Sequence, residues 1–236
     1  IHFFRRKGGN RMYRELLQSG IQVKIIGDGV AAGSGSSDDD RSGPVILTVG
    51  GRDHKEQLGK KCWASLFGAY VRGLYPASRV VNRSCSGLDS TQLRENIRQF
   101  TEEKDRLVLL MIGSNDRRLE DGQKRLKENV KYLLDYFNRK NKSVLLMSYP
   151  PPAEAHESRS DLFFRMAEVD RILGEAAASR YVPFLSHYKL LLSYYREQGT
   201  TVEEMMMEGN GIRDGLHPPD LVHHLIFEQI VRMVEN

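Results

Sequence analysis

An aspartate and a histidine stand three positions apart near the end of this 236-residue chain, in the segment DGLHP at positions 214–218. The glycine permits a tight bend and the proline resists further helix, so the Asp214 carboxylate can reach back to the imidazole N–H of His217. That contact fixes the histidine tautomer and stabilises the imidazolium, as acyl-transfer triads require. The alternative is an aspartate that caps a turn beside an exposed histidine, and the segment taken alone favours it.

A second candidate site follows a β-branched run near the start of the chain, VKIIGDGVAAG at positions 23–33. The run predicts a buried strand that ends in a tight turn at Gly27, Asp28 and Gly29. In an open α/β sheet, ligands bind at the carboxyl ends of the strands. Any chemistry is therefore expected at this turn.

One interpretation of the turn is a dinucleotide-binding fingerprint. Gly27, Gly29 and Ala32 fit the pattern G-x-G-x-x-G/A, and Asp53 follows at roughly the distance of a ribose-binding acid. The fingerprint needs a helix that opens at once, with its amides facing a pyrophosphate. The segment GSGSSDDDRSG at 33–43 favours a loop instead, and its adjacent aspartates would repel a phosphate. The sequence therefore disfavours a nucleotide.

The other interpretation joins the two ends of the chain. Together they resemble the GDSL or SGNH hydrolase family, whose four short blocks can be laid on this chain in order. GDG at 27–29 stands where the family has Gly-Asp-Ser, and NRSCSG at 82–87 resembles the second block. GSND at 113–116 resembles the third block, and DGLH at 214–217 the last. Each block alone is weak, but four in order at the ends of predicted strands are fairly specific.

The resemblance implies roles for five positions. Gly29 falls on the family's nucleophilic serine, and Asp214 and His217 fall on the acid and base of its triad. The backbone amides of Gly29 and Gly87 and the side-chain amide of Asn115 would form the oxyanion hole. Glycine has no hydroxyl, and loss of a triad nucleophile costs on the order of a million-fold in turnover. We therefore expect this chain to be nearly inert as an esterase.

Three explanations for Gly29 remain open. The glycine is an engineered knock-out of an esterase, or a natural residue that leaves a binding module for an acylated ligand, or a nearby hydroxyl such as Ser34 or Ser36 substitutes. The resemblance implies a serine esterase or acylhydrolase acting on a small acyl ester, for which a carbohydrate O-acetyl group is one candidate. The alternatives are a non-catalytic module that binds an acylated saccharide, and an O-acetyltransferase.

Strand-like and helix-like segments alternate along the rest of the chain. Apolar runs of strand length occur at 80–81, 106–112, 143–147 and 182–185. Helical periodicity occurs at 57–74, 88–100, 119–140, 162–180, 188–197 and 219–235. This alternation predicts an α/β fold, three-layer α/β/α with a central, mostly parallel sheet of about five strands. The resemblance implies the same architecture, SGNH hydrolase-like and flavodoxin-like.

Two further segments carry structural expectations. PVILTVGG at 44–51 predicts a short strand or hairpin arm ahead of the first long helix. The loop before it is either a flap bordering the site or a floppy excursion. On the closing helix, His223 and His224 are expected to be ordinary surface or packing residues.

Composition limits the remaining classes. The chain has 40% hydrophobic residues and no low-complexity linker, which predicts one domain over 21–236. The basic segment 1–20 is expected to pack as a helix. The net charge of +4 is mild, and without a compact basic motif we expect no nucleic-acid partner. No apolar run is long enough to span a membrane, and the oligomeric state is left open.

Cofactor and compartment follow from the same residues. Cys62 and Cys85 lack metal-ligand spacing, and Asp38 to Asp40 lack the periodicity of a calcium loop, so we expect metal-independent chemistry without a cofactor. Two cysteines indicate a reducing compartment, and the cytoplasm is the expected location. The chain begins at Ile1, so a removed leader leaves secretion or surface attachment open.

Overall fold

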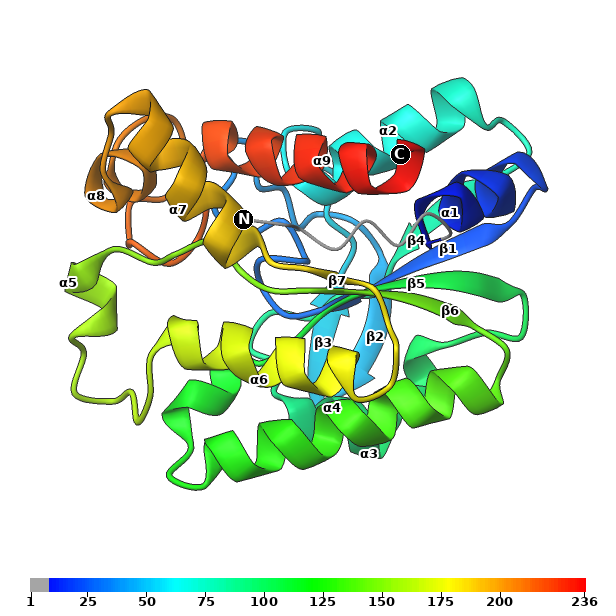
Figure 1. The fold of residues 1–236 in the computed structure, drawn as a ribbon, viewed down its shortest axis with the longest axis horizontal. Helices are drawn as coiled ribbons and strands as arrows, with labels where there is room; N and C mark the ends of the chain where they lie inside the picture. The colour runs from blue at the N-terminus through cyan, green and yellow to red at the C-terminus, as the bar shows by residue number, and fades with distance from the viewer. Residues whose placement is uncertain (1–8) are drawn as a thin grey trace.

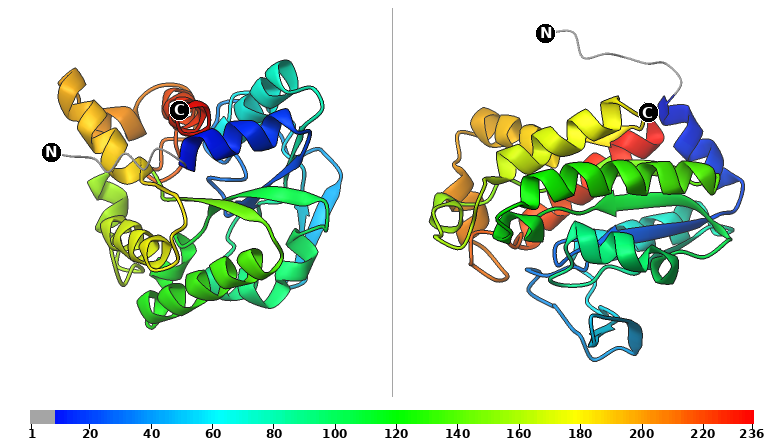
Figure 2. Two further views of the ribbon diagram at one scale, coloured as in Figure 1. Left: turned by 45° about the vertical axis from the view of Figure 1, so that its right-hand side comes forward. Right: turned by 90° about the horizontal axis from the view of Figure 1, so that it is seen from below.

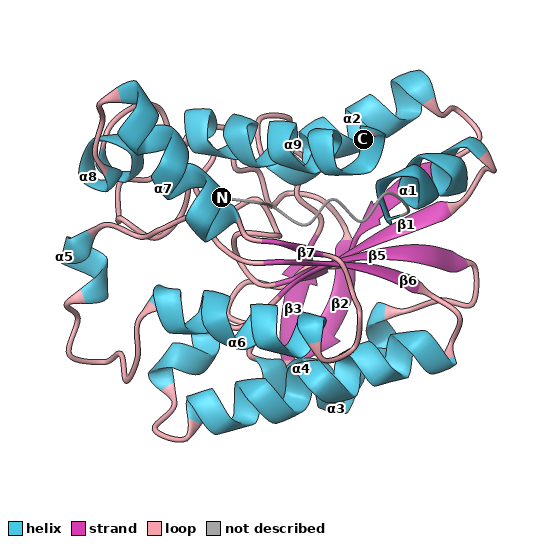
Figure 3. Ribbon diagram, in the orientation of Figure 1, coloured by secondary structure: helices cyan, strands magenta, loops and turns pink. Residues whose placement is uncertain are grey.

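A five-stranded parallel sheet forms the centre of the computed structural model, which describes residues 9–236 (Figure 1). The strand order is β4-β1-β5-β6-β7, and all neighbouring strands run parallel. The strands are Gln22–Gly27 (β1), Arg79–Asn82 (β4), Asp105–Met111 (β5), Ser143–Met147 (β6) and Phe184–Leu185 (β7). Figure 3 shows helices above and below this sheet, which confirms the predicted three-layer α/β/α fold.

The two central strands are buried because helices cover both faces of the sheet. Every residue of β1 is buried, and β5 is buried except at Arg106. Continuous aliphatic runs are typical of such strands. Gly27, which ends β1, leaves no room for a side chain, because a Cβ there would lie 2.2 Å from the carbonyl oxygen of Met111. The close approach of β1 and β5 thus requires glycine immediately before the candidate turn.

The helices form one layer on each face of the sheet (Figure 1). One layer contains α1 (Gly9–Gln18), α2 (Trp63–Leu74) and α9 (Asp220–Glu235), and α9 packs on both of the others. The opposite layer contains α3 (Ser90–Phe100), α4 (Gly122–Arg139) and α6 (Met166–Ala178). The remaining helices are η1 (Asn115–Arg118, a 3-10 helix), α5 (Glu154–Glu157), α7 (His187–Gln198) and α8 (Val202–Met207). None of the helices formed by residues 9–236 has the length and apolar character that a membrane crossing needs.

The chain reverses its direction across the sheet beside β1. From β1 it moves out to the edge strand β4, then crosses back to β5 on the other side of β1 and continues outward to β6 and β7. Ligands of open α/β sheets bind outside the carboxyl ends of the strands at such a reversal. The turns after β1 and β5 both lie at this point.

A two-stranded antiparallel hairpin, β2 (Val45–Val49) and β3 (Arg52–Lys55), is separate from the main sheet. In the right-hand view of Figure 2 it projects from the body of the molecule. It occupies the place of the hairpin arm predicted at 44–51. The hairpin adds a surface beside the carboxyl edge that the parallel sheet alone would not provide.

The first long helix begins later than predicted, at Trp63 rather than at position 57. The backbone amides of Lys60 and Lys61 donate to the Asp38 carboxylate at 2.7 and 3.3 Å, which takes them out of a helical turn. A Cβ on Gly59 would also lie 2.2 Å from the Asp38 carbonyl oxygen. The amphipathic spacing before Trp63 was therefore misleading, because contacts with the preceding loop decide this segment.

The loop after the first turn is tied to the body of the domain. The amide and hydroxyl of Ser37 each donate to the Asp220 carboxylate at 2.7 Å, and the Asp40 amide donates to Gln57 Oε1 at 2.8 Å. At its start, the Ser34 amide donates to the carbonyl oxygen of Gly29 at 2.8 Å. These contacts favour a loop that borders the site over a floppy excursion.

Helix α1 covers the second half of the basic segment expected at 1–20. Tyr13 and Leu17 are fully buried, and the Tyr13 hydroxyl donates to the carbonyl oxygen of Val144 at 2.8 Å. The expectation for positions 1–8 lies outside the described residues. Where it is described, the helix therefore packs into the domain through its apolar face.

Candidate active site

Asp214 and His217 lie in one tight turn. Asp214 Oδ2 accepts a hydrogen bond from His217 Nδ1 at 2.6 Å, and its Oδ1 accepts the amides of Leu216 and His217 at 2.9 and 2.8 Å. Gly215 permits the bend with a φ of 75°. Burial alone would raise the pKa of Asp214, but its hydrogen bonds with His217 hold that pKa well below the usual value. The ionised carboxylate therefore orients the imidazole and leaves Nε2 available.

Gly29 faces this imidazole. A Cβ placed on Gly29 would lie 3.3 Å from His217 Nε2 and 3.3 Å from Ser34 Oγ. Gly29 is not among the glycines with positive φ, so its backbone suits an L side chain. The space is tight, and both neighbours would shift by a few tenths of an ångström. A serine here would thus bring its hydroxyl within reach of the imidazole.

Gly87 and Asn115 follow the ends of β4 and β5. Gly87 has a φ of 82°, a conformation that favours glycine. The Asn115 side-chain amide donates to the carbonyl oxygen of Leu88 at 3.0 Å and to Asp28 Oδ2 at 3.4 Å. Asn115 therefore touches the neighbours in sequence of both Gly87 and Gly29. All five sequence-predicted residues come from strand ends or turns of this region.

The amides of Gly29 and Gly87 are available as donors. Within residues 9–236, neither backbone N–H has a hydrogen-bond acceptor. In acyl transfer, free backbone amides beside a side-chain amide can stabilise a developing oxyanion.

A family model described as GDSL-like lipase/acylhydrolase matches residues 25–225. The chain belongs to this family. No curated protein sequence matches the chain.

Solved structures of several esterases share the fold of this family member. A catalytic mutant of Axe2, an acetylxylan esterase from Geobacillus stearothermophilus, is 19% identical, with 91% of this chain and 94% of that chain covered and a TM-score of 0.66. A lipase/acylhydrolase from Enterococcus faecalis is 18% identical, covering 91% and 95%, with a TM-score of 0.65. The acetyl xylan esterase AlAXEase is 15% identical, covering 91% and 100%, with a TM-score of 0.65.

In this GDSL-family chain, the aspartate of the first block belongs to a buried polar network. Asp28 is 1% exposed, and its Oδ2 accepts the Tyr149 hydroxyl at 2.7 Å. Its Oδ1 accepts the Val30 amide at 3.2 Å. Burial raises the pKa of Asp28 to about 6, although these hydrogen bonds oppose the rise. Asp28 therefore links the end of β1 to the segment after β6 and to Asn115.

A second buried carboxylate fixes η1, the helix that begins with Asn115. Asp116 accepts the Ser90 hydroxyl and, at 3.0 Å, the Ser90 amide at the start of α3. The Asn129 side-chain amide of α4 donates to Ser90 Oγ at 2.9 Å. Burial raises the pKa of Asp116 to about 6. These contacts hold Asn115 between two helices.

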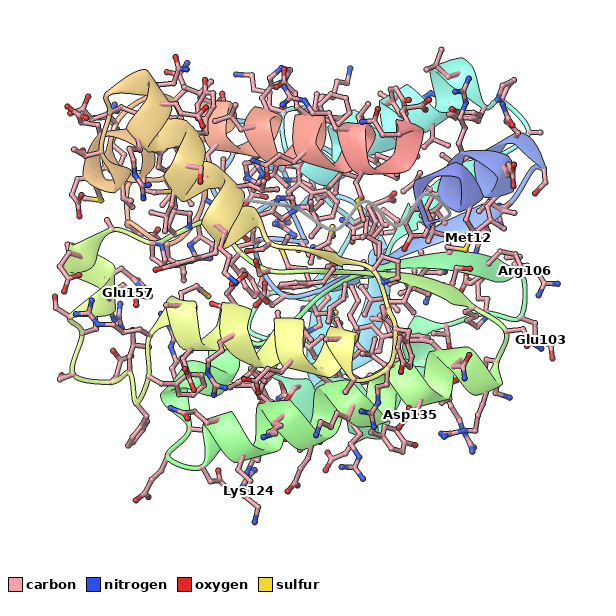
Figure 4. All side chains as sticks on the ribbon, in the orientation of Figure 1. Met12, Glu103, Arg106, Lys124, Asp135 and Glu157 are labelled. Atoms are coloured by element: carbon pink, nitrogen blue, oxygen red, sulfur yellow. The ribbon has the colours of Figure 1, made fainter. Side chains whose placement is uncertain are left out.

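Arg117 secures the other end of η1. The side chain is fully buried and pairs with Glu157 of α5, which Figure 4 labels. Its Nη2 also lies 3.3 Å from His156 Nδ1. Burial and the charge of Arg117 lower the pKa of His156 to about 4, so this histidine is neutral at physiological pH. The ion pair connects the turn after β5 to the segment after β6.

Sequence reasoning missed the structural role of His223. This histidine is buried in α9; its Nδ1 accepts the Trp63 amide at 3.3 Å and its Nε2 donates to the Ser34 carbonyl oxygen at 3.2 Å. Burial lowers its pKa to about 4, which keeps the ring neutral. Its position three residues before Ile226 indicated the buried face of the helix, but the bridge to Ser34 has no sequence signal.

The two candidate substitute hydroxyls differ in environment. Ser36 is buried and donates to the Gly33 carbonyl oxygen at 3.2 Å. Ser34 is half-buried; its Oγ lies 3.4 Å from Ser86 Oγ and accepts a hydrogen bond from Arg41 at 3.3 Å. Neither hydroxyl is hydrogen-bonded to His217 in the described part of the chain.

Metal-ligating side chains do not gather at this site. Among residues 9–236, no group of three or more His, Cys, Asp or Glu side chains could hold a metal ion.

Proposed function

We propose that this chain carries an acyl-ester site for a small acyl group, with an O-acetylated saccharide as its ligand class. Gly29 stands at the nucleophile's position, Asp214 and His217 are the acid and base, and Gly29, Gly87 and Asn115 supply the oxyanion donors. One observation carries the proposal: a side chain at Gly29 would begin 3.3 Å from Nε2 of a histidine whose other ring nitrogen is held by Asp214.

Features of the structural relatives support this assignment. Catalytic mutants of Axe2 replace a serine, an aspartate and a histidine, with the aspartate three positions before the histidine. Asp214 and His217 have the same spacing. Axe2 and AlAXEase are both described as acetylxylan esterases, which supports an acetylated carbohydrate as the ligand.

The proposed chemistry requires a hydroxyl at position 29. A serine there would attack the ester carbonyl carbon while His217 Nε2 takes its proton and Asp214 stabilises the imidazolium. The carbonyl oxygen would gain negative charge and be held by the three amide donors. His217 would return the proton to the departing alcohol, and water would then hydrolyse the acyl-enzyme. With Gly29, only the donors and the base remain.

A binding module for an acylated saccharide is the second candidate. The free amides of Gly29 and Gly87 support it, because they can bind an ester carbonyl that this chain has no hydroxyl to attack. In that case the unmodified chain binds acetylated saccharides and releases them intact.

Gly29→Ser tests the proposal. The variant should hydrolyse a chromogenic acetate several orders of magnitude faster than the unmodified chain, since removing a triad nucleophile costs about a million-fold. Gly29→Ala is the matched control, because it fills the same space without a hydroxyl. Adding His217→Ala to Gly29→Ser should remove the gain.

An inactive Gly29→Ser variant would contradict the proposal. If Gly29→Ser folds normally yet hydrolyses acetyl, butyryl and sugar-acetate esters no faster than Gly29→Ala, the esterase assignment fails. Calorimetric titration of the unmodified chain with acetylated saccharides would then decide the binding-module candidate.

A further inference from the structure

A cavity of about 250 Å³ lies between the β2–β3 hairpin and the turn after β4. Its lining includes the cations Arg41, Arg52 and Lys55 and one carboxylate, Asp53. The hairpin supplies most of these groups. The cavity is therefore predominantly cationic.

Two of the three cations are unpaired. Within residues 9–236, the side chains of Arg52 and Lys55 form no ion pair or hydrogen bond. Arg41 pairs with Asp39 at 2.6 Å, and Asp53 accepts the Thr48 hydroxyl at 2.6 Å. The cavity therefore offers positive charge that the protein itself does not neutralise.

The pKa of a histidine in the cavity depends in part on this charge. The pKa of His54 is lowered, first by burial and then by the positive charges of Arg52 and Arg41, and the charge of Asp53 opposes this only in part. Apart from burial, the net effect of the neighbouring charges on His54 is therefore that of positive charge. An anion would experience the same potential as attraction.

A buried hydroxyl in the cavity wall also lacks a partner. Ser84 lines the cavity and is 3% exposed, and its Oγ has no hydrogen-bond partner in the described part of the chain. Buried hydroxyls are almost always hydrogen-bonded in folded proteins. The Oγ atom itself is buried, so the cations, and not this hydroxyl, face a ligand in the cavity.

The cavity adjoins the candidate active site. Ser86, another of its lining residues, places its Oγ 3.4 Å from Ser34 Oγ, which lies 3.3 Å from the Cβ position of Gly29. Arg52 Nη1 lies 3.7 Å from the Cβ position of Gly87. One ligand of saccharide size can therefore reach from the acyl site into the cavity.

We propose that this cavity is an anion subsite, and that the ligand is an acyl ester whose alcohol part carries a carboxylate, sulfate or phosphate group. The proposal rests on the proposed function, in which the acyl group is small, so the charge belongs to the alcohol part. Arg52 and Lys55 bind the anion. The ligand class is then an acetylated acidic saccharide rather than a neutral one.

Kinetics of Gly29→Ser give the first test. Acetylated glucose is compared with acetylated glucuronic acid, and with the sulfated and phosphorylated glucose acetates, to learn which anion fits. The kcat/KM of at least one anionic ester should exceed that of the neutral ester by about tenfold or more, the typical worth of a charge-assisted hydrogen bond. The preference should shrink as the salt concentration rises.

Charge-removing variants localise the effect. Arg52→Ala and Lys55→Ala, each added to Gly29→Ser, should lower the ratio of anionic to neutral kcat/KM by about tenfold. Arg106→Ala is the matched control: Arg106 is exposed near the start of β5, and Figure 4 shows it on the opposite side of the molecule from Glu157. That variant should leave the ratio unchanged.

Titration of the unmodified chain tests the subsite without any hydrolysis. Acetylated glucuronic acid should bind more tightly than acetylated glucose, and Arg52→Ala should remove the difference. If Gly29→Ser cleaves the neutral ester but shows no anionic preference, the subsite is wrong while the proposed function stands. If Gly29→Ser is inactive, selective anion binding that depends on Arg52 still supports the subsite, and equal binding of both saccharides overturns it.

Discussion

The candidate site has two halves: the turn that carries Asp214 and His217, called the base half, and the turns that follow β1, β4 and β5, called the strand-end half. The carboxylates of the two halves differ in burial and in the direction of their pKa shifts. In the base half, Asp214 sits in a local turn with 42% of its side chain exposed, and its hydrogen bonds with His217 lower its pKa. In the strand-end half, Asp28 is 1% exposed, and burial raises its pKa to about 6. The comparison teaches that the base is oriented by neighbours in sequence, whereas the strand-end half is held by contacts between distant segments.

Breaking the base half should have the largest effect on turnover. Asp214→Asn, introduced into Gly29→Ser, should lower kcat by about 10⁴-fold, because the amide holds the wrong tautomer and does not stabilise the imidazolium. The free energy of unfolding should change by less than about 1 kcal/mol, since the pair is partly exposed. Steady-state kinetics and urea unfolding at pH 7.5 measure both, and a loss of kcat below tenfold would contradict the assigned role.

Breaking the strand-end half should change stability instead. The folded-state pKa of Asp28, about 6, lies above the ordinary value of 3.8, so the folded state binds more protons between these pH values. Stability therefore falls as the pH rises through this window, and the full cost, on the order of 3 kcal/mol, applies above it. Asp28→Asn should be more stable than the parent chain at pH 7.5 and equal to it near pH 4. Urea unfolding across this range checks the result, and a variant less stable at pH 7.5 would refute it.

Asp214 should give the opposite pH dependence in the same experiment. Its lowered pKa stabilises the folded state above the ordinary pKa of an aspartate, and that stabilisation is lost as the pH falls through the folded-state value. Asp214→Asn should therefore lose a little stability at neutral pH and none in strong acid. If the free energies of unfolding of Asp28→Asn and Asp214→Asn changed with pH in the same direction relative to the parent chain, the distinction between the two halves would be wrong.

The smallest effect is expected at Ser34, which lies between the halves. Ser34→Ala should change the free energy of unfolding by no more than about 0.5 kcal/mol and leave Gly29→Ser active, because the hydroxyl is half-buried and bonded to Ser86 and Arg41. Chromogenic acetate assays measure the activity. If the change abolishes residual hydrolysis by the unmodified chain, Ser34 supplies the nucleophile after all.

The same comparison explains what the sequence could predict. The layered fold follows from strand and helix periodicity. The Asp214–His217 contact lies within four consecutive residues, although that segment taken alone favoured a capped turn beside an exposed histidine. The hydrogen bond from the Tyr149 hydroxyl to Asp28 joins positions 121 apart, and no local sequence pattern predicts it. The start of α2 at Trp63 and the bridge made by His223 were missed for the same reason.

The cationic cavity illustrates another limit. Arg41, Arg52 and Lys55 are unremarkable in the sequence, because basic residues are common on exposed hairpins. Their importance comes from the packing of the hairpin beside Ser84 and Ser86, which pattern analysis does not place. The family blocks indicate the candidate acyl site, whereas the proposed selectivity depends on a hairpin outside those blocks.

The hydrogen bond between His223 and Ser34 has a consequence for the order of folding. It joins positions 189 apart in a chain of 236 residues. Contacts of such long range carry the greatest loop-closure cost and tend to form late. The sheet and the turns that carry Gly29, Gly87 and Asn115 can assemble before α9 docks, whereas His217 lies in the turn immediately before α9. During synthesis, the bond between His223 and Ser34 would therefore form only after α9 has left the ribosome.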